Sequence, residues 1–578
     1  MDIKKHIQKK LGEILAELKF ENPPVVKLTD DSGHGDYYSN VAMQAMKQVK
    51  TNIEGITMHS DYGLARDALD MANKIKTAFV PDEYISKVEA VSPGFINFWV
   101  SEKYLLENLS LVSSQKDEYG KGNLFENKKV IVEFTDPNPL KEFHIGHLYS
   151  NAVGESLSRL FENQKAEVWR VCYQGDVGLH VAKALYGIMK YEPGIEKFED
   201  KSLSERAKFL GEAYALGATE FEKNEQAKEE IIELNKKVYD KNPEIYPLYE
   251  KAKGWSLEYF ETLYKRLGTK FDHYYFESDA GEKGLEIVRQ HMGEVFTESD
   301  GAVVFDKEKS GLHTRVFINS QGLPTYETKE LGLAPAKYED FAYDTSVIIT
   351  GNEVNDYFKV LLKALSLISP DLASKTTHIS HGMVRLPSGK MSSRTGDVIT
   401  GDSLLFETEQ KISKEYREVE ESALAKIAVA AIKYTLLKTN IGHDVTFNFE
   451  ESISLNGNSG PYLQYTYVRT QSVLKKAGNV HFAETKITLN TEELNVLRLL
   501  SKFTEIAIES SQRYSPNLLA TYLFELCQAF NLFYQKHSIL EAKEGEDIVQ
   551  FRLLLTQSVG QVIKNGLNLL GIETVEKM

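Results

Sequence analysis

The sequence has only two cysteines, Cys172 and Cys527, and each lies in an apolar segment. So few thiols exclude a disulfide framework and a cysteine-based zinc site, which favours the reducing cytoplasm. Long apolar runs are also lacking: no stretch approaches the roughly 18 uncharged apolar residues of a membrane span. The first twenty residues form a charged amphipathic pattern without the apolar core of a secretory signal. We therefore expect a cytoplasmic protein with no membrane partner.

Positive charge is in deficit, because 68 Lys and Arg stand against 84 Asp and Glu, for a net charge of −16. Broad non-specific binding of nucleic acid depends on an excess of positive charge, so a DNA- or RNA-coating protein is excluded. A local basic face can still bind RNA on an acidic protein. The length of 578 residues indicates several domains.

Changes of pattern along the chain predict three domains. Residues 1–110 combine a helix, a loop region rich in Pro, Gly and Asp, and two strands around a Pro-Gly turn, which indicates a small α/β domain. Residues 125–404 predict a doubly wound, Rossmann-type α/β domain with helices inserted around 190–268. From 405 to 578 the apolar spacing is helical, so we expect an α-helical bundle.

The second domain opens with a clear βαβ pattern. VIVEF (130–134) is an apolar run typical of a buried parallel strand. A helical stripe begins at His144, EVWRVCYQGD (167–176) predicts the next strand, and SVIITGNE (346–353) predicts a later one. Ligands of such sheets bind at the carboxyl edge of the strands, where His144 lies.

His144 and His147 bracket an Ile-Gly pair at that edge. A catalytic zinc usually needs a third ligand, and metalloprotease pairs are spaced i, i+4 around a Glu, so a metal site is disfavoured. The start of a helix instead offers free N–H groups and a positive dipole end to a phosphate. The imidazoles add donors, and Gly146 lets a flat adenine or ribose approach the backbone. We expect attack on the α-phosphate of a nucleotide.

A polar, Gly-containing stretch, LPSGKMSSRTGDVIT (386–400), accompanies this pair. HIGH (144–147) and KMSSR (390–394) together resemble the two motifs of class I aminoacyl-tRNA synthetases, although Ser393 stands where the second motif usually has a lysine. Within the class, the chain is most similar to arginyl-tRNA synthetases, nearly end to end. The similar segments include GDYYSNVAM, VEFTDPNPLKEFHIGHL, FDHYYFES, GLPTYETKELGL, HGMVRLPSGKMSSRTGD and NSGPYLQYTYVRT.

The resemblance implies ATP-dependent ligation of L-arginine to tRNA(Arg). Arginine carboxylate attacks the ATP α-phosphate to give arginyl-adenylate and pyrophosphate, and the 3′-terminal ribose of tRNA then takes the aminoacyl group, releasing AMP. Mg²⁺ accompanies ATP as a substrate ion without a dedicated metal site. Family members usually need bound tRNA before they activate arginine. We expect a monomer with an N-terminal tRNA-binding domain and a C-terminal anticodon-binding domain.

The resemblance also assigns residues to ATP and to catalysis. Lys141 would replace the missing lysine of the second motif, since a point charge near the triphosphate suffices. The second motif would form a loop that closes on the phosphates. The backbone from residue 381 to 384 would recognise adenine. The assigned residues are Lys141, His144, Gly146, His147, His381, Gly382, Met383, Val384, Lys390, Ser392 and Ser393.

Arginine selection needs planar acceptors for a guanidinium. Asp136 and Asn138 match positions near the amino and carboxylate end of the substrate, while Tyr326 and Glu330 share a helix face. Glu277 is a further acidic candidate. The chain departs from the family at two positions, because Glu330 replaces the usual Asp and Val354 aligns with the usual Gln. We expect Glu330 to bind the guanidinium while a backbone or water contact covers for the Gln.

In the helical domain, aromatic and basic groups can stack on unpaired bases and bind their edges. The tRNA-binding region is predicted at Tyr462, Gln464, Tyr465, Arg469, Lys475 and Lys476. Two alternatives remain: a non-catalytic tRNA-binding paralogue, and a class I synthetase with altered amino-acid specificity. A small nucleotidyltransferase would not explain the helical C-terminal third.

Overall fold

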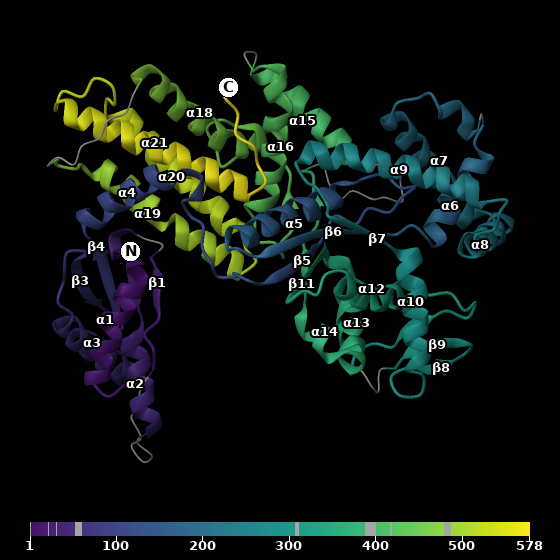
Figure 1. Cartoon of the computed structure of the whole chain (residues 1–578), viewed down its shortest axis with the longest axis horizontal. Helices are drawn as coiled ribbons and strands as arrows, with labels where there is room; N and C mark the ends of the chain where they lie inside the picture. The colour runs from purple at the N-terminus through teal and green to yellow at the C-terminus, as the bar shows by residue number, and fades with distance from the viewer. Residues whose placement is uncertain are drawn as a thin grey trace. The chain divides into compact units, whose positions relative to one another are not determined.

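Figure 1 shows the computed structural model of the chain. Its residues cluster into two compact units, each built from segments distant in the sequence. The first unit contains Met1–Tyr119, Ser472–Phe503 and Glu525–Val562, and the second contains Gly120–Gln471, Thr504–Phe524 and Ile563–Met578. The three predicted domains follow sequence order and stay a prediction. The structure describes residues 2–20, 22–29, 32–52, 61–192, 194–306, 311–387, 400–416, 419–478 and 487–578.

The first unit contains a four-stranded antiparallel sheet with the strand order β1-β2-β4-β3. Its first helix buries Ile3, Ile7, Leu11 and Ile14, which confirms the predicted amphipathic start. The two strands predicted around the Pro-Gly turn are also confirmed, as β3 and β4. The elements are α1 (Ile3–Glu17), β1 (Val26–Leu28), β2 (Tyr37–Ser39), α2 (Val41–Asn52), α3 (Asp61–Ala78), β3 (Ile85–Val91), β4 (Phe95–Val100) and α4 (Glu102–Gln115).

The second unit is organised around a five-stranded parallel sheet with the order β12-β11-β5-β6-β7. The chain runs from β5 to β6 and β7 on one side, then returns to add β11 and β12 on the other. The order therefore reverses between β5 and β11, and a crevice opens there at the carboxyl edge. The strands are β5 (Lys129–Glu133), β6 (Glu167–Gln174), β7 (His273–Phe276), β11 (Thr345–Gly351) and β12 (Thr376–His381).

Helix α5 (Ile145–Asn163) begins at that crevice and confirms the predicted stripe, because Leu148, Leu157 and Leu160 are buried. It packs so closely on the sheet that a Cβ on Gly154 would lie 2.0 Å from the Phe134 ring. Only glycine permits this approach. The βαβ opening predicted from the sequence is therefore confirmed.

The predicted helical insertion is a cluster with its own apolar core on one side of the parallel sheet (Figure 1). It comprises α6 (Leu179–Lys190), α7 (Leu203–Lys223), α8 (Glu225–Tyr239) and α9 (Tyr246–Leu267). A second cluster covers β7 and β11 and includes a three-stranded antiparallel sheet. Its elements are α10 (Glu277–Gln290), β8 (Thr297–Ser299), β9 (Ala302–Phe305), β10 (Arg315–Ile318), α12 (Tyr326–Asp340), α13 (Asn355–Ile368) and α14 (Pro370–Lys375).

The remainder of the chain is mainly helical, as predicted, but β14 interrupts it to pair in parallel with β13. The last four helices each contribute residues to both units. The elements are β13 (Val384–Arg385), α15 (Gly401–Glu415), α16 (Glu421–Leu437), β14 (Val445–Thr446), α17 (Phe449–Ile453), α18 (Gly460–Ala477), α19 (Thr491–Gln512), α20 (Pro516–Lys536) and α21 (Glu546–Leu569).

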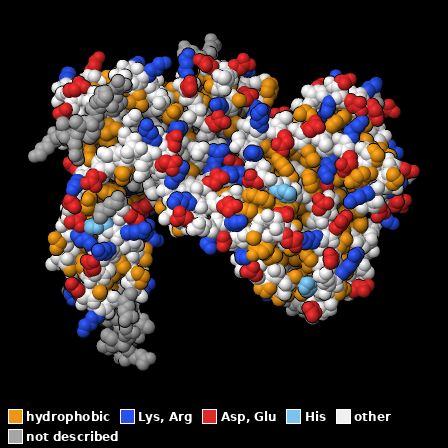
Figure 2. Space-filling model, in the orientation of Figure 1, with side chains coloured by type: hydrophobic (Ala, Val, Ile, Leu, Met, Phe, Trp, Pro, Cys, Tyr) orange, Lys and Arg blue, Asp and Glu red, His pale blue; other side chains and the backbone are white. Residues whose placement is uncertain are grey.

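The surface mixes charges of both signs. Figure 2 shows Lys and Arg interspersed with Asp and Glu over the visible face. Within the described ranges, no helix combines the length and the apolarity needed to cross a bilayer.

Candidate active site

The candidate site is a cavity of about 470 Å³ in the second unit, at the crevice between β5 and β11. Its walls come from the loop after β5, the first turn of α5, the end of β6, and the starts of α10, α12 and α13. The lining brings together these residues of the predicted site: Asp136, Asn138, His144, Gly146, His147, Glu277, Tyr326, Glu330, Val354 and His381.

The loop from β5 to α5 is strained. Thr135, Asp136 and Leu140 have φ values of 81°, 46° and 65°, in the left-handed region that residues with side chains rarely adopt. Such strain persists only where the surroundings enforce it, and it is frequent at active sites. Here the backbone N–H of Thr135 donates to Ser150 Oγ at 2.8 Å, and Asp136 Oδ1 accepts the N–H of Tyr173 at 2.7 Å. These bonds hold the strained loop against α5 and β6.

The two histidines form the N-terminal cap of α5. The N–H of Gly146 donates to His144 Nδ1 at 3.1 Å, and the N–H of His144 donates to His147 Nδ1 at 3.1 Å. Because each Nδ1 is an acceptor, the proton of each neutral imidazole lies on Nε2. The rings stack with their centroids 3.6 Å apart. The cap therefore presents two Nε2–H donors side by side, with both Nδ1 atoms already used.

Both imidazoles are neutral at pH 7. Burial, with Lys141 and His381 nearby, lowers the pKa of His144 to about 4. Burial, then His144 and Lys141, holds the pKa of His147 well below its usual value. His144 is open to the cavity and crowded by protein on its other sides. The pair thus donates hydrogen bonds without carrying charge.

Lys141 lies beside the histidines but does not line the cavity. Its Nζ sits 4.8 Å from the centre of the Tyr214 ring. Burial, with Lys183 nearby, lowers the pKa of Lys141 to about 8. The lysine can therefore serve a phosphate at the cavity only after its side chain turns away from Tyr214.

The segment assigned to adenine enters the cavity only through His381. The N–H of Gly382 donates to Ile441 O, and the N–H of Met383 donates to Asp444 Oδ1. Val384 is buried in β13. The backbone donors of Gly382 and Met383 are thus engaged within the protein, so adenine recognition by them would need other partners to give way.

Another part of the cavity lining carries surplus negative charge. Glu133, at the end of β5, accepts from Lys337 Nζ at 2.6 Å, and both side chains are fully buried. Asp136 and Glu330 lie close to this pair. Burial and Glu133 raise the pKa of both carboxyls well above the usual value, although Lys337 opposes the shift. Three carboxyls here face one lysine, so the wall favours a cation or a proton.

Sequence analysis missed Glu133 and Lys337, although an acidic residue at the end of an apolar strand was a usable signal. Glu277 has its own cation, since Lys329 Nζ donates to Glu277 Oε2 at 2.6 Å. Tyr326, 57% exposed, lies at the cavity mouth with its ring 5.1 Å from Lys329 Nζ. Tyr326 and Glu330 share α12, as predicted, and Tyr357 on α13 hydrogen-bonds the Glu330 carboxyl.

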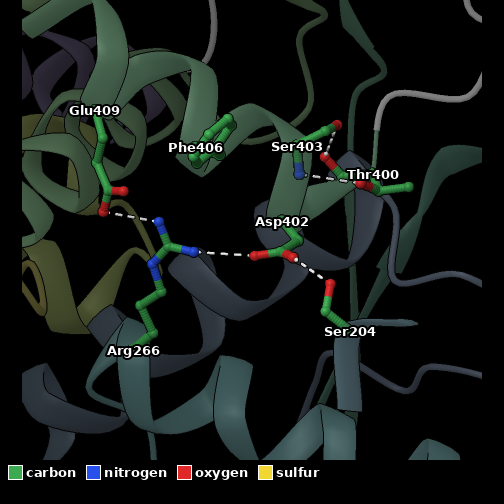
Figure 3. Close-up of a pocket in the computed structure, with 7 residues that line it drawn as sticks. All are labelled: Ser204, Arg266, Thr400, Asp402, Ser403, Phe406 and Glu409. Carbon is green, nitrogen blue, oxygen red and sulfur yellow. Dashed lines mark hydrogen bonds and ion pairs between the residues drawn. The ribbon is translucent and has the colours of Figure 1, made fainter. Parts of the chain in front are cut away.

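The start of α15 is fixed beside the imidazole pair. The N–H of Gly401 donates to Phe143 O at 2.6 Å, and Thr400 pairs with His144. Figure 3 shows the ion pairs that hold this helix, which line a neighbouring surface pocket: Arg266 of α9 binds Asp402 and Glu409 at 3.0 and 2.7 Å. Lys390, Ser392 and Ser393, which precede this anchor, lie outside the described residues.

The predicted tRNA-binding region divides into inward and outward residues on α18. Gln464 is fully buried and its amide donates to Glu573 O at 2.6 Å, so it faces protein and drops out of the set. Tyr462 packs edge-on against Phe524. Arg469 lies over the Tyr465 ring, and Lys475 and Lys476 are exposed.

Comparison with known families decides the class. The model "tRNA synthetases class I (R), catalytic domain" matches residues 108–449. "Arginyl tRNA synthetase N terminal domain" matches 1–100, and "DALR anticodon binding domain" matches 463–578. The chain belongs to the arginyl-tRNA synthetase family. The class I fold and the helical C-terminal domain predicted from the sequence are confirmed.

Individual proteins of the family are also similar to this chain. An arginine–tRNA ligase of Treponema denticola is 32% identical, over 88% of this chain and 90% of that protein. One of Borrelia hermsii is 31% identical, over 87% and 90%. The Thermus thermophilus arginyl-tRNA synthetase structure superposes with a TM-score of 0.81 at 22% identity, covering all of both chains. The Plasmodium falciparum structure gives 0.77 at 20%. These two structures share the fold.

Proposed function

We propose that the cavity binds ATP at the part lined by His144 and His147, its imidazole end. Arginine binds at the part lined by Glu133, Asp136 and Glu330, its acidic end. The family membership gives the reaction, ATP-dependent ligation of L-arginine to tRNA(Arg) through arginyl-adenylate, with AMP and pyrophosphate as products. The observation that carries the residue assignment is that neutral Nε2–H donors and surplus carboxyls line the same cavity from different elements of the fold.

The imidazole end suits a phosphate whose charge grows during attack. His144 and His147 donate from Nε2, and their Nδ1 acceptors are fixed by backbone N–H groups, so no reorganisation is needed as charge develops. Gly146 leaves room for the nucleotide. Lys141 and the second-motif residues Lys390, Ser392 and Ser393 would add charge and donors to the triphosphate, with Mg²⁺ accompanying ATP.

The acidic end suits a dibasic substrate. Glu133, Asp136 and Glu330 against Lys337 leave a formal surplus of two negative charges when all are ionised. Arginine brings a guanidinium and an α-ammonium, and its carboxylate then points toward the imidazole end. We assign the guanidinium to Glu330 and Tyr326. Asp136 and Asn138 take the amino and carboxylate end, and Glu277 stays a candidate through its pair with Lys329.

The tRNA partner needs surfaces outside the cavity. Tyr462, Tyr465, Arg469, Lys475 and Lys476 remain the proposed contacts on α18, within the part that matches the DALR anticodon binding domain. We further propose that the protein acts as a cytoplasmic monomer.

The test is the variant Glu330→Gln, assayed by arginine-dependent ATP–pyrophosphate exchange with tRNA present. Loss of one carboxylate facing a guanidinium should raise the arginine KM at least tenfold, because a hydrogen bond to a charged group contributes about 1.5–3 kcal/mol. The ATP KM should not change. Glu339→Gln, exposed on the same helix, is the matched control.

An unchanged arginine KM in Glu330→Gln would remove Glu330 from the site. Exchange with another amino acid better than with arginine would instead support altered specificity. Retained tRNA binding without exchange would support a non-catalytic paralogue.

A further inference from the structure

One buried polar atom at the acidic end has no hydrogen-bond partner among the described residues. Tyr173, on β6, is 7% exposed and lines the cavity, yet its Oη makes no hydrogen bond within the described structure. Three other buried tyrosines of this unit have a partner for the hydroxyl: Tyr249 with Asp176, Tyr275 with Asp340, and Tyr264 with Cys172. A buried hydroxyl without a partner is destabilising by about 1–3 kcal/mol, so this one calls for an explanation.

The surroundings of Tyr173 define what could satisfy it. The charged groups near its side chain are Glu277, Glu330 and Glu133, and the Tyr357 hydroxyl of α13 lies nearby. The cations that face these carboxyls, Lys329 and Lys337, are each bound to a glutamate. A hydrogen-bond donor on the ligand suits a space bordered by carboxyls, and a cationic donor fits best.

The position of Tyr173 is fixed independently of any ligand. Its backbone N–H donates to Asp136 Oδ1, and it pairs in register with Tyr275 of β7. Its ring packs in the same apolar core as Leu331 and Phe358. The hydroxyl is thus held on a rigid strand rather than on a loop, as a specificity contact requires.

We propose that Tyr173 Oη accepts an N–H of the substrate guanidinium beside Glu330. The proposal rests on the assignment of the acidic end to arginine and deepens it. A guanidinium has five donors in a planar fork, more than one carboxylate can accept, so a further acceptor is needed. Val354 lines the same cavity and has no polar side-chain atom to offer as an acceptor. Tyr173 supplies that acceptor from β6.

The experiment compares Tyr173→Phe with Tyr275→Phe, its neighbour across β6 and β7, whose hydroxyl binds Asp340 outside the cavity lining. In the tRNA-dependent exchange assay, Tyr173→Phe should raise the arginine KM about tenfold or more and leave the ATP KM unchanged. Tyr275→Phe should leave both KM values unchanged.

Thermal melting of the free proteins separates binding from folding. Tyr173→Phe should melt no lower than the wild type, because it removes a hydroxyl that has no partner. Tyr275→Phe should melt lower, because it leaves Asp340 without its donor. An unchanged arginine KM in Tyr173→Phe, or a raised KM accompanied by a lower melting temperature, would overturn the proposal.

Inhibition by n-butylguanidine, which has the guanidinium alone, locates the contact. Tyr173→Phe should weaken this inhibition by the same factor as it raises the arginine KM. Undiminished inhibition would place the hydroxyl elsewhere on the substrate and overturn the assignment. Glu330→Gln distinguishes failure of the proposal for Tyr173 from failure of the proposed function. If Glu330→Gln raises the arginine KM and Tyr173→Phe does not, only the role of Tyr173 fails. If neither does, the acidic end itself is misassigned.

Discussion

The imidazole end and the acidic end of the cavity differ in how far the protein itself satisfies their polar groups. At the imidazole end, His144 and His147 come from one helical turn, are neutral, and have their Nδ1 atoms satisfied by the backbone before any ligand arrives. At the acidic end, Glu133, Asp136 and Glu330 come from β5, its following loop and α12, and their charge is only partly balanced by Lys337. The first end is complete by itself, whereas the second is completed by a cationic ligand.

The largest effect should come from removing the cation of the acidic end. Lys337→Met leaves Glu133 buried without its partner, which should lower the free energy of unfolding by about 3–5 kcal/mol. Urea unfolding measures this. The double variant Glu133→Gln/Lys337→Met should recover most of the loss. A loss as large in the double variant would mean that packing, and not charge, explains the effect.

The imidazole end should affect catalysis more than binding. His147→Ala removes an Nε2–H donor aimed at the phosphate, so kcat for pyrophosphate exchange should fall by about 10²–10³. The arginine KM should not change. His291→Ala, at the end of α10 and outside the cavity lining, is the control and should keep full activity. A raised arginine KM in His147→Ala would contradict the separation of the two ends.

The two ends should respond to pH in opposite senses. The folded pKa of His144, about 4, lies below its ordinary value of 6.5, so the unfolded chain takes up the proton first. Its stabilising contribution is complete above pH 6.5 and is lost as the pH falls toward 4. The folded pKa of Glu330 lies above the ordinary 4.5, so the folded protein holds this proton more tightly than the unfolded chain. The stabilising contribution of Glu330 is therefore complete below pH 4.5 and is lost as the pH rises above 4.5.

Unfolding free energies of His144→Gln and Glu330→Gln, measured from pH 4 to 8, test this opposition. His144→Gln should reduce the loss of stability on acidification. Glu330→Gln should reduce the loss on alkalinisation. Two variants that shift the profile in the same direction would contradict the opposite pKa shifts of the two ends.

The smallest effect should come from the anchor of α15 beside the imidazole end. Arg266 is partly exposed and binds Asp402 and Glu409, so Arg266→Met should lower the free energy of unfolding by only about 0.5–1 kcal/mol. The effect should shrink in 0.5 M salt, which screens such pairs. A loss that does not depend on salt would indicate that the arginine stem, rather than its charge, holds the helix.

The same contrast explains what the sequence could predict. The imidazole end lies within four residues at a strand-to-helix junction, so spacing and position were enough to find it. Tyr326 and Glu330 were found because their spacing on one helix matches residues that the resemblance to arginyl-tRNA synthetases implies. Glu133, Lys337 and Tyr173 come together only through the strand order, which no local pattern contains. Gln464 was assigned to tRNA because the sequence does not show which way it points from α18. That direction depends on packing against the chain near Glu573.

The Nε2–H tautomers and the orphan hydroxyl of Tyr173 were also beyond sequence analysis, since both follow from individual hydrogen bonds. The second motif, Lys390 to Ser393, lies outside the described residues, so its role stays a prediction.

The central claim is that ATP and arginine occupy opposite ends of one cavity. The most direct measurement is the pair of KM values, for arginine and for ATP, in Glu330→Gln and His147→Ala under tRNA-dependent exchange. The account predicts that Glu330→Gln raises only the arginine KM, while His147→Ala lowers kcat and leaves the arginine KM unchanged. A rise in the ATP KM alone in Glu330→Gln would contradict it.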